Sequence, residues 1–345
     1  RTIAFNSGAD GNLGVWVTNA NTISAREDLT AVTANGYIYA IGGDDNGGVD
    51  MKTVQYAKIN SDGSTGAWAT STESISARND HTSVVANGYV YVIGGANSTD
   101  KSTIQYAKLN SDGSTGAWAT STNNMSARNG HSSVVANGYV YVIGGENVVE
   151  LSSVQYAKLN SDGSTGAWAT TTSISTRDNL SSVVANGYIY AIGGDNDSIE
   201  LSTVQYAKIN SDGSLGAWAT STESISAREN FRSVVANGYV YAIGGANGGS
   251  AKSNIQYAKL NSDGSTGAWA TSTNSVSSGR SDHGSVVANG YVYIIGGGNS
   301  VSQSTVSYSS LARTSISGNL DLLGLASTTL ADSGDSTFGS VGSSI

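Results

Sequence analysis

The chain has 345 residues, no cysteine, no proline and 44 glycines, and its formal net charge is -9 at pH 7. The missing cysteine excludes disulfides and thiolate metal sites, and the negative charge argues against a broad nucleic-acid or anionic membrane surface. No apolar run approaches the roughly twenty residues of a membrane-spanning helix. The chain begins at Arg1 inside a strand-like segment, so we expect any secretion signal to lie upstream of it.

The N-terminal residues predict a strand at 2–5, a polar turn at 9–14 and a further strand at 14–19. These elements look like the last part of a repeat that the rest of the chain shows in full. Because an incomplete repeat needs a partner for its strands, we expect the segment to pair with the other end of the chain.

A repeat of about fifty residues covers most of the chain. Its marks are a Gly-Gly doublet, one tryptophan and one arginine in each of six units. The doublets are Gly42-Gly43, Gly94-Gly95, Gly144-Gly145, Gly193-Gly194, Gly244-Gly245 and Gly296-Gly297. The tryptophans are Trp16, Trp68, Trp118, Trp168, Trp218 and Trp269, and the arginines are Arg26, Arg78, Arg128, Arg177, Arg228 and Arg280.

One unit, from Arg78 onward, predicts four strands. Residues 83–86 form the first, and Asn87-Gly88 is a hairpin turn that needs φ > 0 at both positions. Residues 89–93 are apolar on both faces, which is typical of a strand buried between two sheets. A third strand at 103–109, a polar turn at 110–116 and a fourth strand opening at Trp118 complete the unit. Helical periodicity is absent, so the repeat predicts an all-β propeller with one blade per unit.

The unit resembles the kelch repeat. That family has a Gly-Gly doublet closing the second strand, a tyrosine in the third and a tryptophan opening the fourth, which match Gly94-Gly95, Tyr106 and Trp118. An arginine and often a histidine precede the first strand, as Arg78 and His81 do here. Kelch units often carry a proline near that arginine, and this chain has none. The resemblance implies a six-bladed kelch-type β-propeller over residues 1–313.

The last unit offers strands at 284–288, 291–295 and 305–311 but lacks the fourth. We expect the N-terminal strand at 14–19 to complete this blade and close the ring. Residues 2–5 and 305–311 both resemble a third strand, and one slot cannot hold both. Three solutions remain: one segment is displaced outward, a seventh blade lies outside this chain, or one segment pairs with a neighbouring molecule. We favour six blades with one displaced segment.

The repeat ends before residue 314, and residues 314–345 form a tail rich in Ser, Gly, Thr and Leu. Leu320, Leu322 and Leu323 predict a strand or a short apolar anchor. The tail is either a linker toward a further domain or a strand that packs on a second copy of the chain.

The loops that follow the Gly-Gly doublets vary between units, whereas the Asn-Gly and Asn-Ser-Asp-Gly-Ser turns on the opposite face hardly change. Loops on a rigid scaffold are the usual place for binding, so the variable face is the candidate recognition surface. Asp44 and Asp45 open one oxygen-rich loop, and residues 195–200 form another; either could hold calcium, although neither has a complete calcium-loop spacing. No other metal or cofactor is expected.

The residues around the six arginines supply the remaining candidates. The arginines themselves are expected to bond backbone carbonyls at loop-to-strand junctions, with a converging anion site as the alternative. His81, His131 and His283 share one register with Phe231, so this position favours packing over a three-histidine metal site. Carboxylates of the same segments are the only plausible catalytic set for a channel-mouth enzyme: Asp80, Asp178, Glu229 and Asp282.

These features predict a non-enzymatic bacterial protein of the cell surface or extracellular space, used for adhesion or assembly. The expected ligand is a glycan or a protein bound by the variable loops, with no role in nucleic-acid binding. One alternative is a structural subunit that forms homo-oligomers or filaments through its terminal segments. The other is a carbohydrate-active enzyme with its site at the channel mouth.

Overall fold

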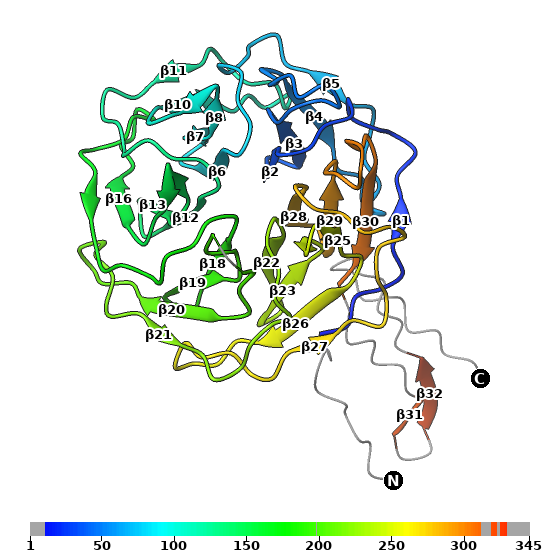
Figure 1. The fold of residues 1–345 in the computed structure, drawn as a ribbon. Helices are drawn as coiled ribbons and strands as arrows, with labels where there is room; N and C mark the ends of the chain where they lie inside the picture. Colours follow the sequence, from blue (N-terminus) through cyan, green and yellow to red (C-terminus); the bar gives the residue numbers. More distant parts are fainter. Residues whose placement is uncertain (1–10, 198, 312–318, 323–324, 330–345) are drawn as a thin grey trace.

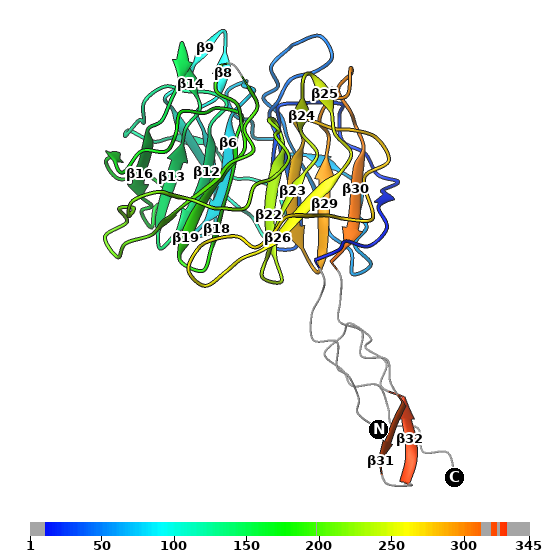
Figure 2. The same ribbon diagram turned by 60° about the horizontal axis from the view of Figure 1, so that its bottom comes forward.

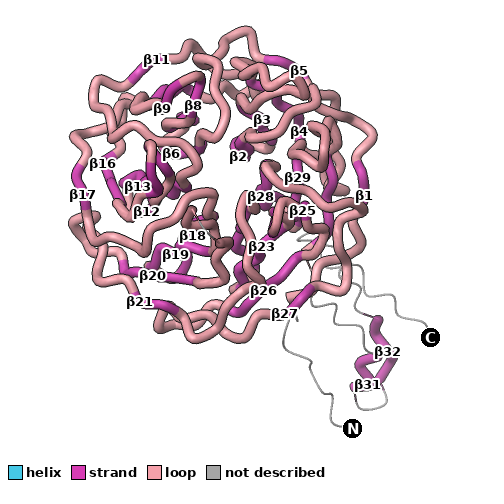
Figure 3. Tube along the Cα trace, viewed as in Figure 1, coloured by secondary structure: helices cyan, strands magenta, loops and turns pink. Residues whose placement is uncertain are grey.

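The computed structural model describes residues 11–197, 199–311, 319–322 and 325–329. Six four-stranded antiparallel sheets stand in a ring around a central channel, as Figure 1 shows. The described residues consist of strands and loops alone (Figure 3), and among them no helix is long and apolar enough to span a membrane. The predicted six-bladed all-β propeller is therefore confirmed.

The strands of each blade run from the channel outward. Blade 1 contains β2 (Thr30–Ala34), β3 (Tyr37–Ile41), β4 (Val54–Lys58) and β5 (Ala69–Thr70); blade 2 contains β6 (Thr82–Ala86), β7 (Tyr89–Ile93), β10 (Ile104–Lys108) and β11 (Ala119–Thr120). Blade 3 contains β12 (Ser132–Ala136), β13 (Tyr139–Ile143), β16 (Val154–Lys158) and β17 (Ala169–Thr170); blade 4 contains β18 (Ser181–Ala185), β19 (Tyr188–Ile192), β20 (Val204–Lys208) and β21 (Ala219–Thr220). Blade 5 contains β22 (Arg232–Ala236), β23 (Tyr239–Ile243), β26 (Ile255–Lys259) and β27 (Ala270–Thr271); blade 6 contains β28 (Gly284–Ala288), β29 (Tyr291–Ile295), β30 (Val306–Ser310) and β1 (Val17–Thr18).

The second strand of every blade is buried on both faces because it lies between the neighbouring blades. In β7, Val90, Tyr91, Val92 and Ile93 are all 0% exposed. Side chains alternate between the faces of a strand, so Val90 and Val92 pack toward blade 1 while Tyr91 and Ile93 pack toward blade 3. The hydrophobic core is accordingly divided into six clusters, each shared by two adjacent blades.

The ring is closed by the N-terminal strand, as predicted. β1 pairs antiparallel with β30, with Val17 opposite Tyr308 and Thr18 opposite Ser307. The third position of blade 6 is thus occupied by β30, and residues 2–5, which competed for it in the sequence, lie outside the described residues. The fourth strand is shorter than expected from residues 14–19, because only Val17 and Thr18 complete the ladder.

A glycine contact shows that the N-terminus also supplies the missing turn. In blade 1, Gly63 has φ +84° and lies so close to Tyr291 of blade 6 that an added Cβ would meet the ring at 2.7 Å. Gly11, with φ +74°, takes the equivalent place in blade 6, where an added Cβ would meet Tyr257 of blade 5. Only glycine tolerates both the positive φ and the close approach of an aromatic ring.

Short hairpins that the sequence did not predict extend three of the loops after the Gly-Gly doublets. They are β8 (Ala96–Asn97) with β9 (Thr99–Asp100), β14 (Glu146–Asn147) with β15 (Val149–Glu150), and β24 (Ala246–Asn247) with β25 (Ser250–Ala251). Figure 2 shows them projecting from one face of the ring. In the tail, β31 (Asn319–Leu322) pairs with β32 (Leu325–Thr329), which includes the predicted strand at Leu320 and Leu322; Leu323 lies outside the described residues.

Candidate functional site

The two faces of the ring differ in what they present. We define the upper face as the one formed by the loops after the Gly-Gly doublets (Figure 2). It also includes the segments that join the outer strand of one blade to the first strand of the next, which contain the six arginines. The lower face contains the Asn-Gly turns and the Asn-Ser-Asp-Gly-Ser turns. In the latter, Asp62 Oδ1 accepts hydrogen bonds from the backbone N and hydroxyl of Ser64, and the same arrangement recurs in the four turns that follow. The lower face is therefore one motif repeated, and variation is concentrated above.

The arginines lie beneath the upper face, where they hold the loops. Arg78 is 1% exposed and donates to the carbonyls of Ser76 and Gly94 and to the side chains of Thr103 and Gln105. Arg26, Arg128, Arg177 and Arg228 donate to the equivalent groups of their own blades. The donors of these five arginines are used within their own blades, so these five offer no free anion site.

Arg280 is the exception among the six. Blade 6 has Ser307 where the other blades have a glutamine, and Arg280 makes one side-chain hydrogen bond, of 3.3 Å, to the carbonyl of Gly296. Its Nε is buried and has no hydrogen-bond partner. The blade completed by the N-terminus therefore anchors its arginine least.

The residue two positions after each arginine lines the mouth of the channel. These residues are Asp28, Asp80, Gly130, Asn179, Asn230 and Asp282, and all six have positive φ. Backbone hydrogen bonds join four pairs of these residues. The amide of Gly130 donates to the carbonyl of Asp80, that of Asn179 to Gly130, that of Asn230 to Asn179, and that of Asp282 to Asn230. Asp80 and Asp282 were predicted candidates; Asp28 was missed, although aligning the six units at the arginine would have placed it in the same register.

The three aspartates come from adjacent blades 6, 1 and 2 and share hydrogen bonds at the mouth. The side chain of Asp28 bonds to those of both Asp282 and Asp80. Burial, together with the charges of Asp80, Asp282 and Asp44, raises the pKa of Asp28 well above its usual value. Burial and Asp282 raise the pKa of Asp80 to about 6, and burial raises that of Asp282. A cationic group at the mouth would stabilise the ionised form of these crowded carboxyl groups, so the site favours a cation.

Below the mouth, the channel is narrow and lined by hydroxyl groups. A cavity of about 130 Å³ is bounded by the first strands of the blades, including Thr30, Thr82, Ser132 and Ser181. Arg232 of β22 takes the equivalent place in blade 5, and it is the charged residue of this lining. Its guanidinium lowers the pKa of both Asp80 and Asp282. Sequence reasoning missed Arg232, although the other blades carry Thr, Ser or Gly there.

The histidine register contributes to the core and does not reach the upper face. His81, His131 and His283 are 1%, 4% and 0% exposed, and Phe231 is 0% exposed. His81 and His131 hydrogen-bond through Nε2 to Thr30 and Thr82 of the preceding blade. Burial lowers the pKa of all three histidines. These four side chains therefore pack between blades, as the sequence predicted for this register.

The remaining predicted acids lie on the upper face around the mouth. Burial and Glu27 raise the pKa of Asp44 to about 7, while Asp45 Oδ1 accepts from the amides of Gly47 and Val49 and shapes its loop. Burial and Asp195 raise the pKa of Glu229 to about 7. Asp178 is buried beside Asp195 at the junction of blades 3 and 4.

Aliphatic side chains cap the upper loops. Val49, Val148, Val149, Ile199 and Val301 are 62%, 96%, 59%, 62% and 55% exposed, and all lie in loops that follow a Gly-Gly doublet. The six loops, residues 44–52, 96–101, 146–151, 195–201, 246–252 and 298–303, contain no aromatic residue. The upper face therefore combines an acidic centre with aliphatic tips and lacks the rings on which sugars commonly stack.

We predict that the urea midpoint of unfolding falls as the pH rises from about 6.5 to about 8.5 in the presence of EDTA. Asp44 and Glu229, with pKa values of about 7, and Asp178, with about 9, hold protons that the unfolded chain has already lost. The folded state therefore binds more protons, and its stability declines with pH. Asp178→Asn should reduce the decline.

The window begins at about pH 6.5 because the buried histidines act in the opposite direction below it. Their lowered pKa values make the folded state lose stability as the pH falls through the unfolded value. His81→Leu, which copies Leu29 of blade 1, should therefore leave the decline above pH 6.5 unchanged. A midpoint that does not vary with pH would show that these carboxyl groups are ionised in the folded chain.

A closed ring of six such blades, with variable loops and a lined channel on one face, defines a kelch-type β-propeller, a fold that suggests a binding module. Residues 12–194, more than half of the chain, match the KLHDC2/KLHL20/DRC7 Kelch-repeats domain, and the chain belongs to this family. A solved structure described as "Structure of YjhT" is 15% identical, with a TM-score of 0.66 over 84% of this chain and 95% of that one, and it shows the same fold. No curated protein matches the chain.

Proposed function

We propose that the chain is a non-enzymatic binding module of the cell surface or extracellular space that holds a protein ligand on its upper face. In this proposal a lysine or arginine of the ligand enters the acidic mouth formed by Asp28, Asp80 and Asp282. Apolar residues of the ligand pack on the aliphatic tips around it. Charge complementarity would select the ligand, and burial of the tips would supply affinity.

The observation that carries the proposal is the coincidence of the two features on one face. A ligand that covers exposed aliphatic groups such as Val148 removes their apolar surface from water, which favours binding. Groups of such residues mark interaction sites more often than single exposed residues do. The lower face, by contrast, carries both an aspartate such as Asp62 and a lysine such as Lys58 in five of the six blades. It offers neither an acidic centre nor unlike loops.

A protein ligand is favoured over a glycan by the composition of the loops. Carbohydrate sites usually combine polar groups with an aromatic platform, and the six upper loops carry aliphatic residues instead. The three aspartates also touch one another through hydrogen bonds. A glycosidase needs about 5–9 Å between its two carboxyl groups to admit a sugar or a water molecule, so this arrangement favours binding over hydrolysis.

The test is selection of peptides from a random display library on the immobilised chain. We expect peptides that contain Lys or Arg, with binding that weakens at high salt. The double variant Asp28→Asn/Asp80→Asn and the double variant Val148→Ser/Val149→Ser should each bind them at least tenfold more weakly. Asp62→Asn/Asp112→Asn removes the same charge from the lower face and should bind them as the wild type does.

Two results would overturn this function. Peptides that bind all these variants equally well would place recognition elsewhere on the molecule. Binding to a glycan array that survives the two upper-face double variants, in the absence of any peptide binding, would identify a different ligand class and a different surface.

A further inference from the structure

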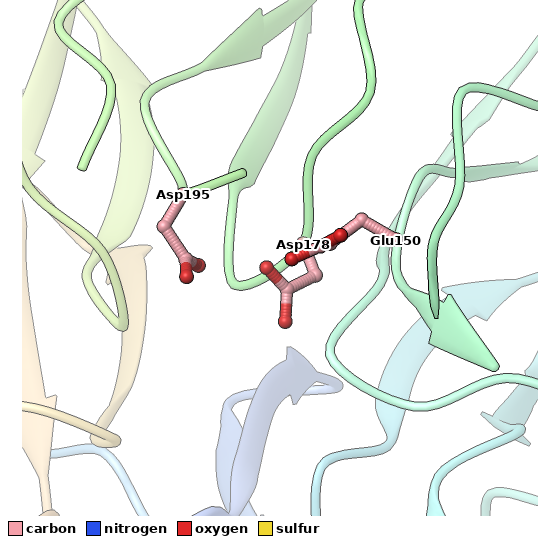
Figure 4. Close-up of side chains that lie close together, drawn as sticks. All are labelled: Glu150, Asp178 and Asp195. Carbon is pink, nitrogen blue, oxygen red and sulfur yellow. The ribbon is translucent and has the colours of Figure 1, made fainter. Parts of the chain in front are cut away.

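Three carboxylates converge where blades 3 and 4 meet on the upper face. Figure 4 shows Glu150, Asp178 and Asp195 side by side, and one oxygen of each lies within 4.8 Å of one oxygen of the other two. Glu150 ends β15, Asp178 follows Arg177, and Asp195 follows the Gly-Gly doublet of blade 4. Backbone hydrogen bonds of 3.2 and 3.1 Å between Asp178 and Asp195 hold the last two together.

The central carboxylate is buried and incompletely satisfied. Asp178 is 6% exposed; its Oδ2 accepts from Asn179 Nδ2 at 3.0 Å, but its Oδ1 is buried without a hydrogen-bond partner. Oδ1 of Asp195 is also buried and unpartnered. Buried carboxylate oxygens that lack a donor require either a proton or a cation to compensate them.

The charges around Asp178 are negative. Burial, Asp195, Glu146 and Glu150 all raise the pKa of this carboxyl group, to about 9. Arg177, the adjacent cation in the sequence, already donates to Gly193, Thr203 and Gln205. A single shared proton would offset one of the three carboxylate charges, whereas a divalent cation would offset two.

The other junctions of the ring provide an internal comparison. At the junction of blades 2 and 3 the same three positions are Asp100, Asn129 and Glu146, and Asn129 Nδ2 donates to Asp100 Oδ1 at 2.7 Å. An amide thus supplies the donor where blade 4 has the carboxylate of Asp178. The remaining junctions carry Asp50, Asn79 and Ala96; Glu200, Glu229 and Ala246; Ala251, Ser281 and Gly298; and Ser302, Glu27 and Asp44. All these positions are described in the structure, and three carboxylates meet at the junction of blades 3 and 4 alone.

We propose that Glu150, Asp178 and Asp195 bind one calcium ion that joins blades 3 and 4. Calcium accepts six to eight oxygen ligands at 2.3–2.6 Å, so two of its ligands can lie up to about 5 Å apart, which suits the spacing of these carboxylates. Magnesium demands strict octahedral geometry at 2.0–2.1 Å and gives up its water reluctantly, so three carboxylates held by loops favour calcium. Glu150 and Asp195 are half-buried, and this leaves access for the water molecules that would complete the coordination shell.

The test is isothermal titration of the EDTA-treated chain with CaCl₂ at pH 7.5. We expect one site with a dissociation constant of about 10⁻⁴–10⁻³ M, the range of extracellular calcium modules, and at least tenfold weaker binding of MgCl₂. Asp178→Asn copies the residue of blade 3 and should abolish the site while the chain stays folded. Asn129→Asp should create a second equivalent of bound calcium, because it places a third carboxylate beside Asp100 and Glu146.

Thermal unfolding supplies a second readout that does not depend on the heat of binding. Calcium should raise the midpoint of the wild type and leave that of Asp178→Asn unchanged. Wild-type protein that binds no calcium up to about 10 mM, roughly tenfold above the upper end of the expected range, would overturn the proposal. So would Asp178→Asn that still binds one equivalent, since calcium would then lie elsewhere.

Discussion

Replacing Arg78 by methionine should destabilise the propeller by about 3–4 kcal/mol, measured as the shift in the free energy of unfolding in urea. The guanidinium donates to two backbone carbonyls and to the side chains of Thr103 and Gln105. Methionine fills part of the volume but donates nothing, so the carbonyl of Gly94 and the amide oxygen of Gln105 would remain buried without their donor. The cost of these orphaned acceptors dominates the effect.

Arg280→Met provides the matched control. Arg280 is equally hidden, at 4% exposure, but makes one long side-chain hydrogen bond and leaves its Nε unsatisfied. We expect its loss to cost about 1–2 kcal/mol. Equal losses for the two variants would mean that bulk and charge, and not the hydrogen bonds to the loop, determine the contribution of this ring.

Deleting residues 1–19 should open the ring and cause the chain to aggregate. The deletion removes β1 and exposes the edge of β30, a ready template for pairing with other chains. It also removes Leu13, which is 2% exposed and packs with Val276 and Leu311 in the cluster between blades 5 and 6. Size-exclusion chromatography of the refolded protein would measure the loss of monomer.

Two further variants separate closure from simple shortening of the chain. Deletion of residues 1–10 keeps Gly11 and every contact described for the closing strand, so we expect the elution volume of the wild type. Leu13→Ala keeps the strand but leaves a cavity, with an expected cost of about 3 kcal/mol. A soluble protein of unchanged size after deletion of residues 1–19 would refute the closure by β1.

The closing strand also explains why the ends of the repeat looked incomplete. The amides of Gly14 and Asn19, which flank β1, donate to the carbonyls of Ser310 and Val306 at 2.8 Å, so residues 14–19 complete the last blade. A propeller closed in this way binds its two ends together, and each blade gains two neighbours. The rigid ring that results can hold loops of unlike sequence without changes beneath them.

Local features of the sequence determined the blade. The Gly-Gly doublets, the Asn-Gly turns and the aromatic and β-branched runs such as Tyr89–Ile93 predicted strand bounds to within a few residues, because φ > 0 and strand propensity are properties of short segments. The sequence did not delimit the outer strands: the strand predicted at 14–19 is Val17–Thr18, and the one predicted to open at Trp118 is Ala119–Thr120. Their length depends on how far the neighbouring blade allows the ladder to extend, and no short segment encodes that.

The tertiary structure decided the sites, because each combines residues from different blades. Asp28 and Asp282 lie at opposite ends of the sequence, and they meet only because the ring closes. In the sequence Arg232 is simply a charged residue in a predicted strand, and only the folded ring shows that it lines the channel beneath the mouth. Glu150, Asp178 and Asp195 likewise belong to two units of the repeat. Periodicity specifies each blade by itself, whereas the distances between carboxylates depend on the packing of one blade against the next.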